Sequence, residues 1–299
     1  MDISKIVHPS DVFKKHYETI FGRHNKPQDL PIDFLPDLNR KIWGLQKKKL
    51  VIVGGRPSMG KSSFLLQLAL SLAKQGKTVY FFSFEMSKEV CVERMFSSEC
   101  EIDNWLLRTG DIVNIADNPE YNIKLTNFYK TLDDMKFMLV ETIGRNLPQL
   151  NEILKMFPHK PDAVFIDYGN MVETEKSKTR KESLDEYIKG LRALAIHNDF
   201  CAIMAAQINR KTHESGKIRE PKIWELKETG ELEQVSDMVF LLHWQYYYER
   251  DPGTKNDYII NIAKNRDGRT AQKKILFFPE YSKFKEVEND NTENDRRSY

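Results

Sequence analysis

Short, almost uninterrupted apolar runs recur along the chain from residue 50 onward, separated by longer stretches of mixed apolar and polar residues. Runs with an apolar residue at nearly every position indicate strands that are buried on both faces. A parallel sheet covered by helices has strands of this kind, so we expect an α/β fold with a mostly parallel central sheet. The predicted strands are Leu50–Val53, Thr78–Phe84, Phe137–Val140, Ala163–Ile166, Ala202–Ala205, Met238–Leu242, Tyr258–Ala263 and Lys274–Phe278.

Three of the intervening stretches predict helices that flank this sheet: Lys61–Lys74, Asn146–Phe157 and Ser183–His197. In the third stretch apolar residues recur every three or four positions, which places them on one stripe of a helix. Ser183 and Glu186 fit a capping box, so this helix is expected to begin at Ser183.

The two ends of the chain differ in composition from its middle. Residues 1–34 are mixed and polar, and we expect an N-terminal arm or linker with a short helix over Val12–Phe21. Residues 35–285 form the predicted domain, and Asp267-Gly268 between its last two strands signals a closing β-hairpin. Residues 286–299 are polar and acidic, which predicts a disordered tail.

Composition excludes several classes of protein. The chain has 299 residues, and 46 Lys and Arg against 44 Asp and Glu give a net charge of +2, which excludes a simple polybasic nucleic-acid binder. No apolar run approaches a membrane span, and the N-terminus lacks the apolar segment of a secretory signal. Cys91, Cys100 and Cys201 form no C-x-x-C pair, so we expect neither a disulfide scaffold nor a zinc ribbon, and a reducing compartment fits.

The segment from Gly55 to Ser62 fits the pattern G-x-x-x-x-G-K-[ST] between a predicted strand and a predicted helix, the context that a P-loop requires. In such a loop backbone N–H groups surround a phosphate, and Lys61 reaches the β- and γ-phosphates of a nucleotide. Ser62 would ligate Mg²⁺. The predicted nucleotide-binding residues are Gly55, Arg56, Pro57, Ser58, Met59, Gly60, Lys61, Ser62 and Ser63.

Three polar residues follow other predicted strands, where ligands of open α/β sheets bind. Asp167 ends an apolar strand, which is the Walker B position, and would hold Mg²⁺. Glu85 either activates the attacking water or caps the helix that follows Met86. Gln207 either hydrogen-bonds a γ-phosphate or begins a polar loop.

Lys264 and Arg266 lie at the end of a predicted strand, and residues i and i+2 of a strand point to one face. Two cations on one face form a clamp for phosphate, although solvated charges on a hairpin are more common. The segment Glu225–Gly230 either follows a sugar-phosphate chain or is a solvated loop. The aromatic residues from Trp244 to Tyr248 either stack on bases or pack in a core or interface, and packing is favoured. The seven histidines, His243 included, show no metal-ligand spacing.

Taken in order, seven segments resemble the C-terminal, RecA-like ATPase domain of DnaB-type replicative DNA helicases. The resemblance covers roughly residues 35–280. The segments are Gly55–Leu66, Phe82–Met86 with the following Ser87, Arg94 and Ser97, Leu107–Gly110, Phe165–Val172, Ala206–Arg210, Leu226–Gln234 and Ala263–Gly268.

The resemblance implies a ring hexamer that encircles single-stranded DNA and moves 5′ to 3′ by hydrolysing ATP with Mg²⁺. It implies that Lys61 and Ser62 bind phosphate and Mg²⁺, that Asp167 supports Mg²⁺, and that Glu85 is the catalytic base. Gln207 would sense the γ-phosphate, and Lys264 and Arg266 would reach the nucleotide of the neighbouring subunit. Lys227, Glu228 and Gly230 would bind DNA in the central loop.

The sequence departs from the family's pattern at three places. Lys227 replaces the usual arginine of the DNA-binding loop, and a lysine binds phosphate less well than a bidentate arginine. Gly169-Asn170 replaces the usual Leu-Gln. About 35 residues precede the ATPase core, so we expect the family's N-terminal domain, which usually meets primase, to be lacking.

The prediction is an ATP-dependent DNA helicase motor of the cytoplasm, of bacterial or phage origin, whose partners are single-stranded DNA, its own copies and a loader or primase. Two alternatives remain: a DNA-dependent ATPase of the same fold that does not unwind, and a non-enzymatic modulator of a host helicase ring. The intact Lys61, Asp167 and Glu85 argue against the second.

Overall fold

The computed structural model describes residues 8–11, 13, 17, 28–111, 118–141, 146–167, 173, 178–208, 219–226 and 230–287. Most of the helix predicted over residues 12–21 lies outside these residues, as do residues 288–299 of the predicted tail. Among the described residues, no helix is both long and apolar enough to cross a membrane.

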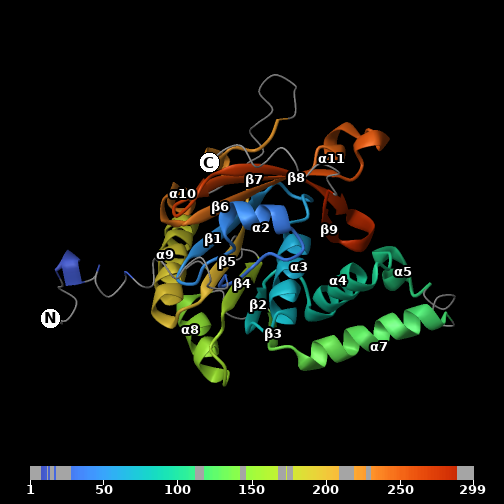
Figure 1. Ribbon diagram of the computed structural model, residues 1–299, viewed down its shortest axis with the longest axis horizontal. Coiled ribbons are helices and arrows are strands. Elements are labelled where there is room, and N and C mark those ends of the chain that lie inside the picture. Colours follow the sequence, from blue (N-terminus) through green and yellow to red (C-terminus); the bar gives the residue numbers. More distant parts are fainter. Residues whose placement is uncertain are drawn as a thin grey trace.

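A single twisted sheet runs through the centre of the molecule (Figure 1). Its order is β3-β2-β4-β5-β1-β6-β7-β8-β9; the pairs from β3 to β6 are parallel, and the pairs from β6 to β9 are antiparallel. The expected mostly parallel sheet and its closing hairpin are therefore confirmed. The strands are β1 Leu50–Gly55, β2 Val79–Ser83, β3 Phe137–Glu141, β4 Ala163–Asp167, β5 Cys201–Gln207, β6 Met238–His243, β7 Asp257–Asn265, β8 Ala271–Phe278 and β9 Lys283–Glu286.

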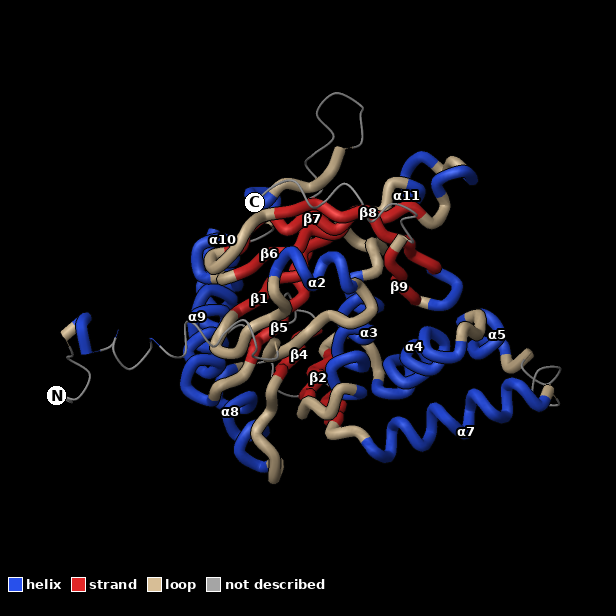
Figure 2. Tube along the Cα trace, in the orientation of Figure 1, coloured by secondary structure: helices blue, strands red, loops and turns tan. Residues whose placement is uncertain are grey.

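Helices cover both faces of the parallel strands, and each strand sends alternate side chains into two different cores. In β1, Val51 and Val53 join the core beneath α3 (Lys61–Lys74), whereas Leu50 and Ile52 join the core beneath α9 (Arg180–Asn198). Figure 2 shows these two helices on opposite sides of the sheet. Burial on both faces explains why the runs are continuously apolar. The helices are α2 Pro36–Ile42, α3 Lys61–Lys74, α4 Lys88–Cys100, α5 Asn104–Thr109, α7 Pro119–Asp134, α8 Leu147–Met156, α9 Arg180–Asn198, α10 Gly230–Val235 and α11 Tyr246–Glu249.

The core extends past the expected N-terminal end of the domain, and the last strand passes the expected C-terminal end by one residue. Leu30 and Ile32, which were assigned to the arm, are fully buried, and Leu30 pairs with Leu45. Phe284 of β9 stacks on Phe277 with ring centroids 4.4 Å apart. Glu286, the first residue of the predicted tail, ends β9 and lies 3.3 Å from the Lys273 ammonium. Short buried segments outside the main apolar runs thus belong to the fold.

The predicted start of α9 is wrong by one turn. Thr179 is the N-cap: its hydroxyl accepts from the Glu182 amide, and the Glu182 carboxylate accepts from the Thr179 amide at 2.7 Å. Ser183 instead lies inside the helix and is buried. Both positions match the capping-box pattern in sequence, and the true cap adds a turn to the helix.

Candidate nucleotide-binding site

The P-loop connects β1 directly to α3, as the sequence predicts. Ser58 and Gly60 adopt positive φ angles of 63° and 75°, and turns of this kind direct neighbouring N–H groups towards one anion. A Cβ atom at Gly60 would lie 3.1 Å from Phe277 and 3.2 Å from Phe284. The backbone conformation and this close packing both favour glycine at position 60.

Lys61 is folded back over the loop that precedes it. Its ammonium donates to the carbonyl oxygens of Gly55 and Arg56, both at 3.0 Å. Burial lowers the pKa of Lys61 to about 8, and the carboxylates of Asp167 and Glu85 partly oppose this shift. A partly buried ammonium that has two carbonyl partners among the described residues and two nearby carboxylates is suited to bind an added polyanion.

Asp167 ends β4 and is 1% exposed. Neither of its carboxylate oxygens has a hydrogen-bond partner of normal geometry among the described residues. Burial raises the pKa of Asp167 to about 6; the Ser62 hydroxyl and the Lys61 ammonium oppose the shift, and the Glu85 carboxylate adds to it. A buried carboxylate whose oxygens lack partners, next to a hydroxyl, fits the donor set of a Mg²⁺ ion.

Glu85 lies two residues past the end of β2, where its side chain is exposed to solvent. The preceding amide, of Phe84, donates to the Asp167 carbonyl at 2.7 Å, which brings the two strand ends together. The alternative that Glu85 caps the next helix is wrong, because Ser87 is the N-cap of α4. Glu85 is therefore an exposed carboxylate beside the carboxyl ends of β2 and β4.

Gln207 is the last residue of β5 and is directly opposite Gly55 in the parallel pairing of β1 and β5. The sheet order β2-β4-β5-β1 therefore places Glu85, Asp167, Gln207 and the P-loop at the ends of four adjacent strands. Strands far apart in sequence build one site because they are parallel neighbours.

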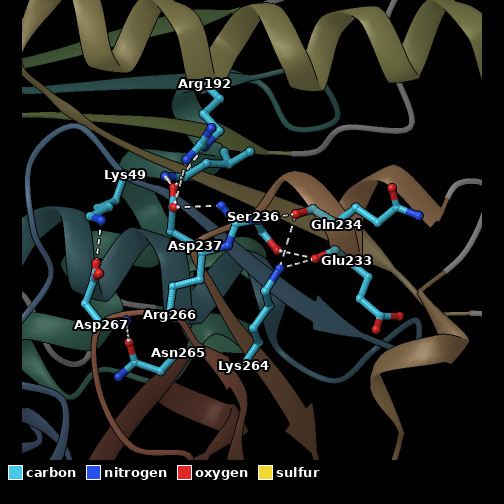
Figure 3. A network of polar contacts seen from close by, with 11 residues as sticks. Lys49, Arg192, Glu233, Gln234, Ser236, Asp237, Lys264, Asn265, Arg266 and Asp267 are labelled. Atoms are coloured by element: carbon cyan, nitrogen blue, oxygen red, sulfur yellow. Dashed lines mark hydrogen bonds and ion pairs between the residues drawn. The ribbon is translucent and has the colours of Figure 1, made fainter.

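Lys264 and Arg266 lie near the amino-terminal ends of β1 and β6, whereas their own P-loop follows the carboxyl end of β1. Asn265 is paired with Met238 at the start of β6, and the neighbouring residue of β1 is Val51, four residues or about 13 Å of strand before Gly55. Both side chains point to one face, as predicted (Figure 3). Lys264 donates to the carbonyls of Glu233 and of Gln234, the latter at 3.3 Å, and Arg266 also donates to the Gln234 carbonyl.

The predicted DNA-binding residues Lys227 and Glu228 lie outside the described residues, and Gly230 is the first residue of α10. Leu226, just before them, forms a bridge with Ile208. A Cβ atom at Gly54 would lie 2.8 Å from the Leu226 side chain. The entrance to the candidate DNA loop is thus packed against the strand that carries the P-loop.

The segment before this loop is anchored and is not a simple solvated turn. Glu225 is 7% exposed and is held by the Arg219 guanidinium at 2.5 Å and by the Lys222 amide at 2.9 Å. The sequence analysis missed this pair, since two opposite charges six residues apart are a common pattern.

The aromatic cluster supports the P-loop. Trp244 is 7% exposed and contacts Phe277 edge-on, which confirms the packing alternative for this residue. The Arg56 guanidinium lies over the Tyr248 ring at 5.5 Å, and the Tyr258 hydroxyl donates to the Met59 carbonyl. The sequence gives no signal for these contacts, because the partners are about 190 residues or more from the P-loop.

His243 is buried at the end of β6, and burial lowers its pKa. Within the described part of the chain, no group of three or more His, Cys, Asp or Glu side chains could hold a metal ion.

Two curated relatives align over most of this chain. The replicative DNA helicase DnaB of Geobacillus stearothermophilus is 30% identical over 286 residues, which cover 93% of this chain and 62% of that protein. The probable replicative DNA helicase of Trieres chinensis is 31% identical over 259 residues, 83% of this chain and 55% of that protein. The chain therefore spans less than two thirds of the length of either relative.

Two solved structures share the fold. One is a DnaB-like replicative helicase described with its interactions with primase (TM-score 0.83, 23% identity, 95% of this chain and 68% of that chain). The other is a solved ATPase domain (TM-score 0.84, 23% identity, 95% of this chain and all of that chain). The expected RecA-like α/β fold is confirmed. A model of the DnaB-like helicase C-terminal domain matches residues 32–286, and the chain belongs to that family.

Proposed function

We propose that this chain is the ATP-hydrolysing motor of a replicative DNA helicase, working as a ring of six copies that moves 5′ to 3′ on single-stranded DNA. One observation carries the proposal: the P-loop, Asp167, Glu85 and Gln207 meet at the ends of four adjacent strands in a member of this helicase family. A phosphate cradle, a cation site, a base and an amide are the parts that nucleotide hydrolysis requires.

The proposed ligand is ATP with Mg²⁺. The buried carboxylate of Asp167 and the adjacent Ser62 hydroxyl suit a divalent cation, and the two positive φ angles of the P-loop suit a phosphate. Bound Mg²⁺ supplies positive charge that neutralises phosphate oxygens during hydrolysis. Lys61 exchanges its two carbonyl partners for phosphate oxygens, and Glu85 accepts the proton of the attacking water. Gln207 hydrogen-bonds the γ-phosphate.

The active site is completed by a second copy of the chain. Lys264 and Arg266 lie about 13 Å or more from their own P-loop along the strands, and the exposed fraction of Arg266 is 41%. In a ring, these cations serve the nucleotide of the neighbouring subunit, where an arginine stabilises the charge that develops on the phosphate.

Single-stranded DNA is the proposed track, and Lys227, Glu228 and Gly230 are its proposed contacts. The proposed place of action is the replication fork in the cytoplasm, of a host cell if the protein is encoded by a phage. A helicase loader or a primase are further proposed partners.

Strand displacement on a fork with a 5′ single-stranded tail tests this function. We expect ATP-dependent unwinding of the 5′-tailed fork and none of a fork with only a 3′ tail. ATP hydrolysis stimulated by DNA without unwinding would identify a DNA-dependent ATPase. Neither activity, with binding to a host helicase, would identify a modulator.

The shared active site is tested by mixing variants. Glu85→Ala and Arg266→Ala proteins should each hydrolyse ATP at least about 10³-fold more slowly than the unmodified protein. In mixed rings, some interfaces pair an intact Glu85 with a neighbour's intact Arg266, so hydrolysis should recover and peak near equal mixing. If the rate stays near zero at every mixing ratio, in rings whose measured mass confirms that they contain both proteins, Arg266 has no role in the neighbouring site.

A further inference from the structure

A buried carboxylate lies behind the two cations that are proposed to act in the neighbouring subunit (Figure 3). Asp237, the residue before β6, is 3% exposed. Its Oδ2 accepts from the Leu50 amide at 3.0 Å and from Arg192 Nε at 3.2 Å, and its Oδ1 accepts from Arg192 Nη2 at 3.1 Å. Asp237 is thus fixed by a bidentate arginine from α9 and by the start of β1.

Arg266 contacts Asp237 through both its backbone and its side chain. Its amide donates to the Asp237 carbonyl at 2.9 Å, and its Nη1 lies 3.6 Å from Asp237 Oδ1. The other side of the guanidinium donates to the Gln234 carbonyl at the end of α10. These three contacts fix the base and the direction of a side chain that is otherwise long and flexible.

More positive than negative charges lie around Asp237. Two guanidinium groups share one carboxylate, and Lys264 lies beside them, on the Glu233 and Gln234 carbonyls. Burial alone would raise the pKa of Asp237, but the Arg192 hydrogen bonds and the Leu50 amide outweigh it, and the pKa lies below its ordinary value. Arg192 therefore satisfies Asp237 already, and Arg266 is oriented by the carboxylate without being needed to neutralise it.

We propose that Asp237, held by Arg192, is a positioning residue for Arg266, and that it sets the orientation in which the guanidinium meets the nucleotide of the neighbouring copy. This inference rests on the proposed function. Positioning matters here because a displacement of about 1 Å of a catalytic group costs about 100-fold in rate. A purely structural alternative exists, since Asp237 also joins β6 to β1 through its two bonds with Leu50.

The Asp237→Asn variant separates the two roles. An asparagine keeps an oxygen for the Leu50 amide but loses the charge that attracts both guanidinium groups. We expect kcat for ATP hydrolysis to fall about 10- to 100-fold, with the KM for ATP changed by less than about twofold, because the variant's own P-loop, Glu85 and Asp167 are intact. Asp267→Asn is the matched control: it removes the carboxylate of the residue that follows Arg266, which forms an ion pair with Lys49, and should keep the original kcat.

Mixed rings show in which site the defect lies. Asp237→Asn and Glu85→Ala proteins should restore hydrolysis when mixed. At some interfaces the Asp237→Asn protein supplies an intact P-loop and Glu85, and the Glu85→Ala protein supplies a correctly positioned Arg266. A structural role predicts that Asp237→Asn damages its own site, so mixing would give no recovery. A normal kcat for Asp237→Asn would also overturn the inference.

Two further measurements keep the result interpretable. If Asp237→Asn fails to fold or to form rings, the Arg192→Lys variant tests the inference instead, because lysine keeps the charge but loses the bidentate contact with Asp237. We expect a smaller loss of kcat, and recovery of hydrolysis when this protein is mixed with the Glu85→Ala protein. No loss of kcat would overturn the inference. Recovery between Arg266→Ala and Glu85→Ala proteins tests the proposed function separately. If that pair recovers and the Asp237→Asn pair does not, the shared site stands and only the role of Asp237 is wrong.

Discussion

Asp167 and Lys61 carry opposite charges where water is largely excluded, and burial disfavours each charge. The pKa of Asp167 is about 6 in the folded protein against an ordinary value of 3.8. The folded state therefore holds a proton that the unfolded state has lost between these pH values. Stability falls as pH rises from about 3.8 to about 6, and the whole cost of the ionised carboxylate is present above pH 6.

Asp167→Asn should consequently stabilise the nucleotide-free protein at pH 7.5. Two pKa units correspond to about 3 kcal/mol, and this net shift already contains the attraction to Lys61, so the expected gain is at most about 3 kcal/mol. The free energy of unfolding, measured by denaturant titration, should show this gain at pH 7.5 and little difference at pH 4. An unchanged or lower stability at pH 7.5 would mean that the carboxylate is better solvated than its burial indicates.

Lys61 and Glu85 should fail at different steps. Lys61→Ala should lose ATP hydrolysis and much of the affinity for nucleotide, because the phosphate loses its principal cation. Glu85→Ala should keep nucleotide binding and lose turnover, because the carboxylate acts on water and not on the bound nucleotide. Equilibrium binding of a fluorescent nucleotide and steady-state hydrolysis measure the two steps. Hydrolysis at the original rate by Glu85→Ala would show that this assignment is wrong.

At the scale of elements, sheet strands were predictable and several helices were not. Each predicted strand lies within a few residues of an observed one, since burial on both faces leaves a continuous apolar run. No helix was predicted over α7, although Tyr121, Leu125, Phe128 and Leu132 recur every three or four positions along it; Phe128 is buried, and Tyr121 and Leu132 pack against the core. The cap of α9 was predicted at Ser183, because two capping-box patterns follow one another directly, at residues 179–182 and 183–186.

Two substitutions test the corrected start of α9. Thr179→Ala removes an N-cap and should lower the free energy of unfolding by about 1 kcal/mol. Ser183→Ala is the matched control: the Ser183 hydroxyl is buried without a hydrogen-bond partner among the described residues, and alanine favours helix, so stability should be unchanged or higher. Thermal unfolding of both variants measures the difference. The opposite order of stabilities would restore Ser183 as the cap.

At the scale of the whole molecule, the sequence predicted the parts of the site that lie at strand ends, and it could not predict what holds them. Asp167 and Gln207 were identifiable because each ends an apolar run, and the parallel order brings them together. Arg266 is supported by Asp237 and Gln234, which lie about 30 positions earlier in the sequence. Asp237 directly precedes β6, and Gln234 belongs to the six-residue helix α10. Such contacts depend on three-dimensional packing, and the local sequence pattern does not indicate them.

The proposed DNA track also concerns the whole molecule, since a chain with a net charge of +2 must bind DNA through a local set of cations. Single-stranded DNA should stimulate ATP hydrolysis, and its affinity should fall steeply as salt increases, because phosphate contacts release counterions.

Lys227→Ala should weaken binding about equally for all sequences and reduce the salt slope by roughly one contact per engaged subunit. Lys155→Ala, which removes an exposed lysine of α8, is the matched control and should leave both properties unchanged. Fluorescence anisotropy at several salt concentrations measures affinity and slope together. A strong sequence preference, or a slope that Lys155→Ala reduces as much as Lys227→Ala, would argue against a translocating motor that follows the DNA backbone through this loop.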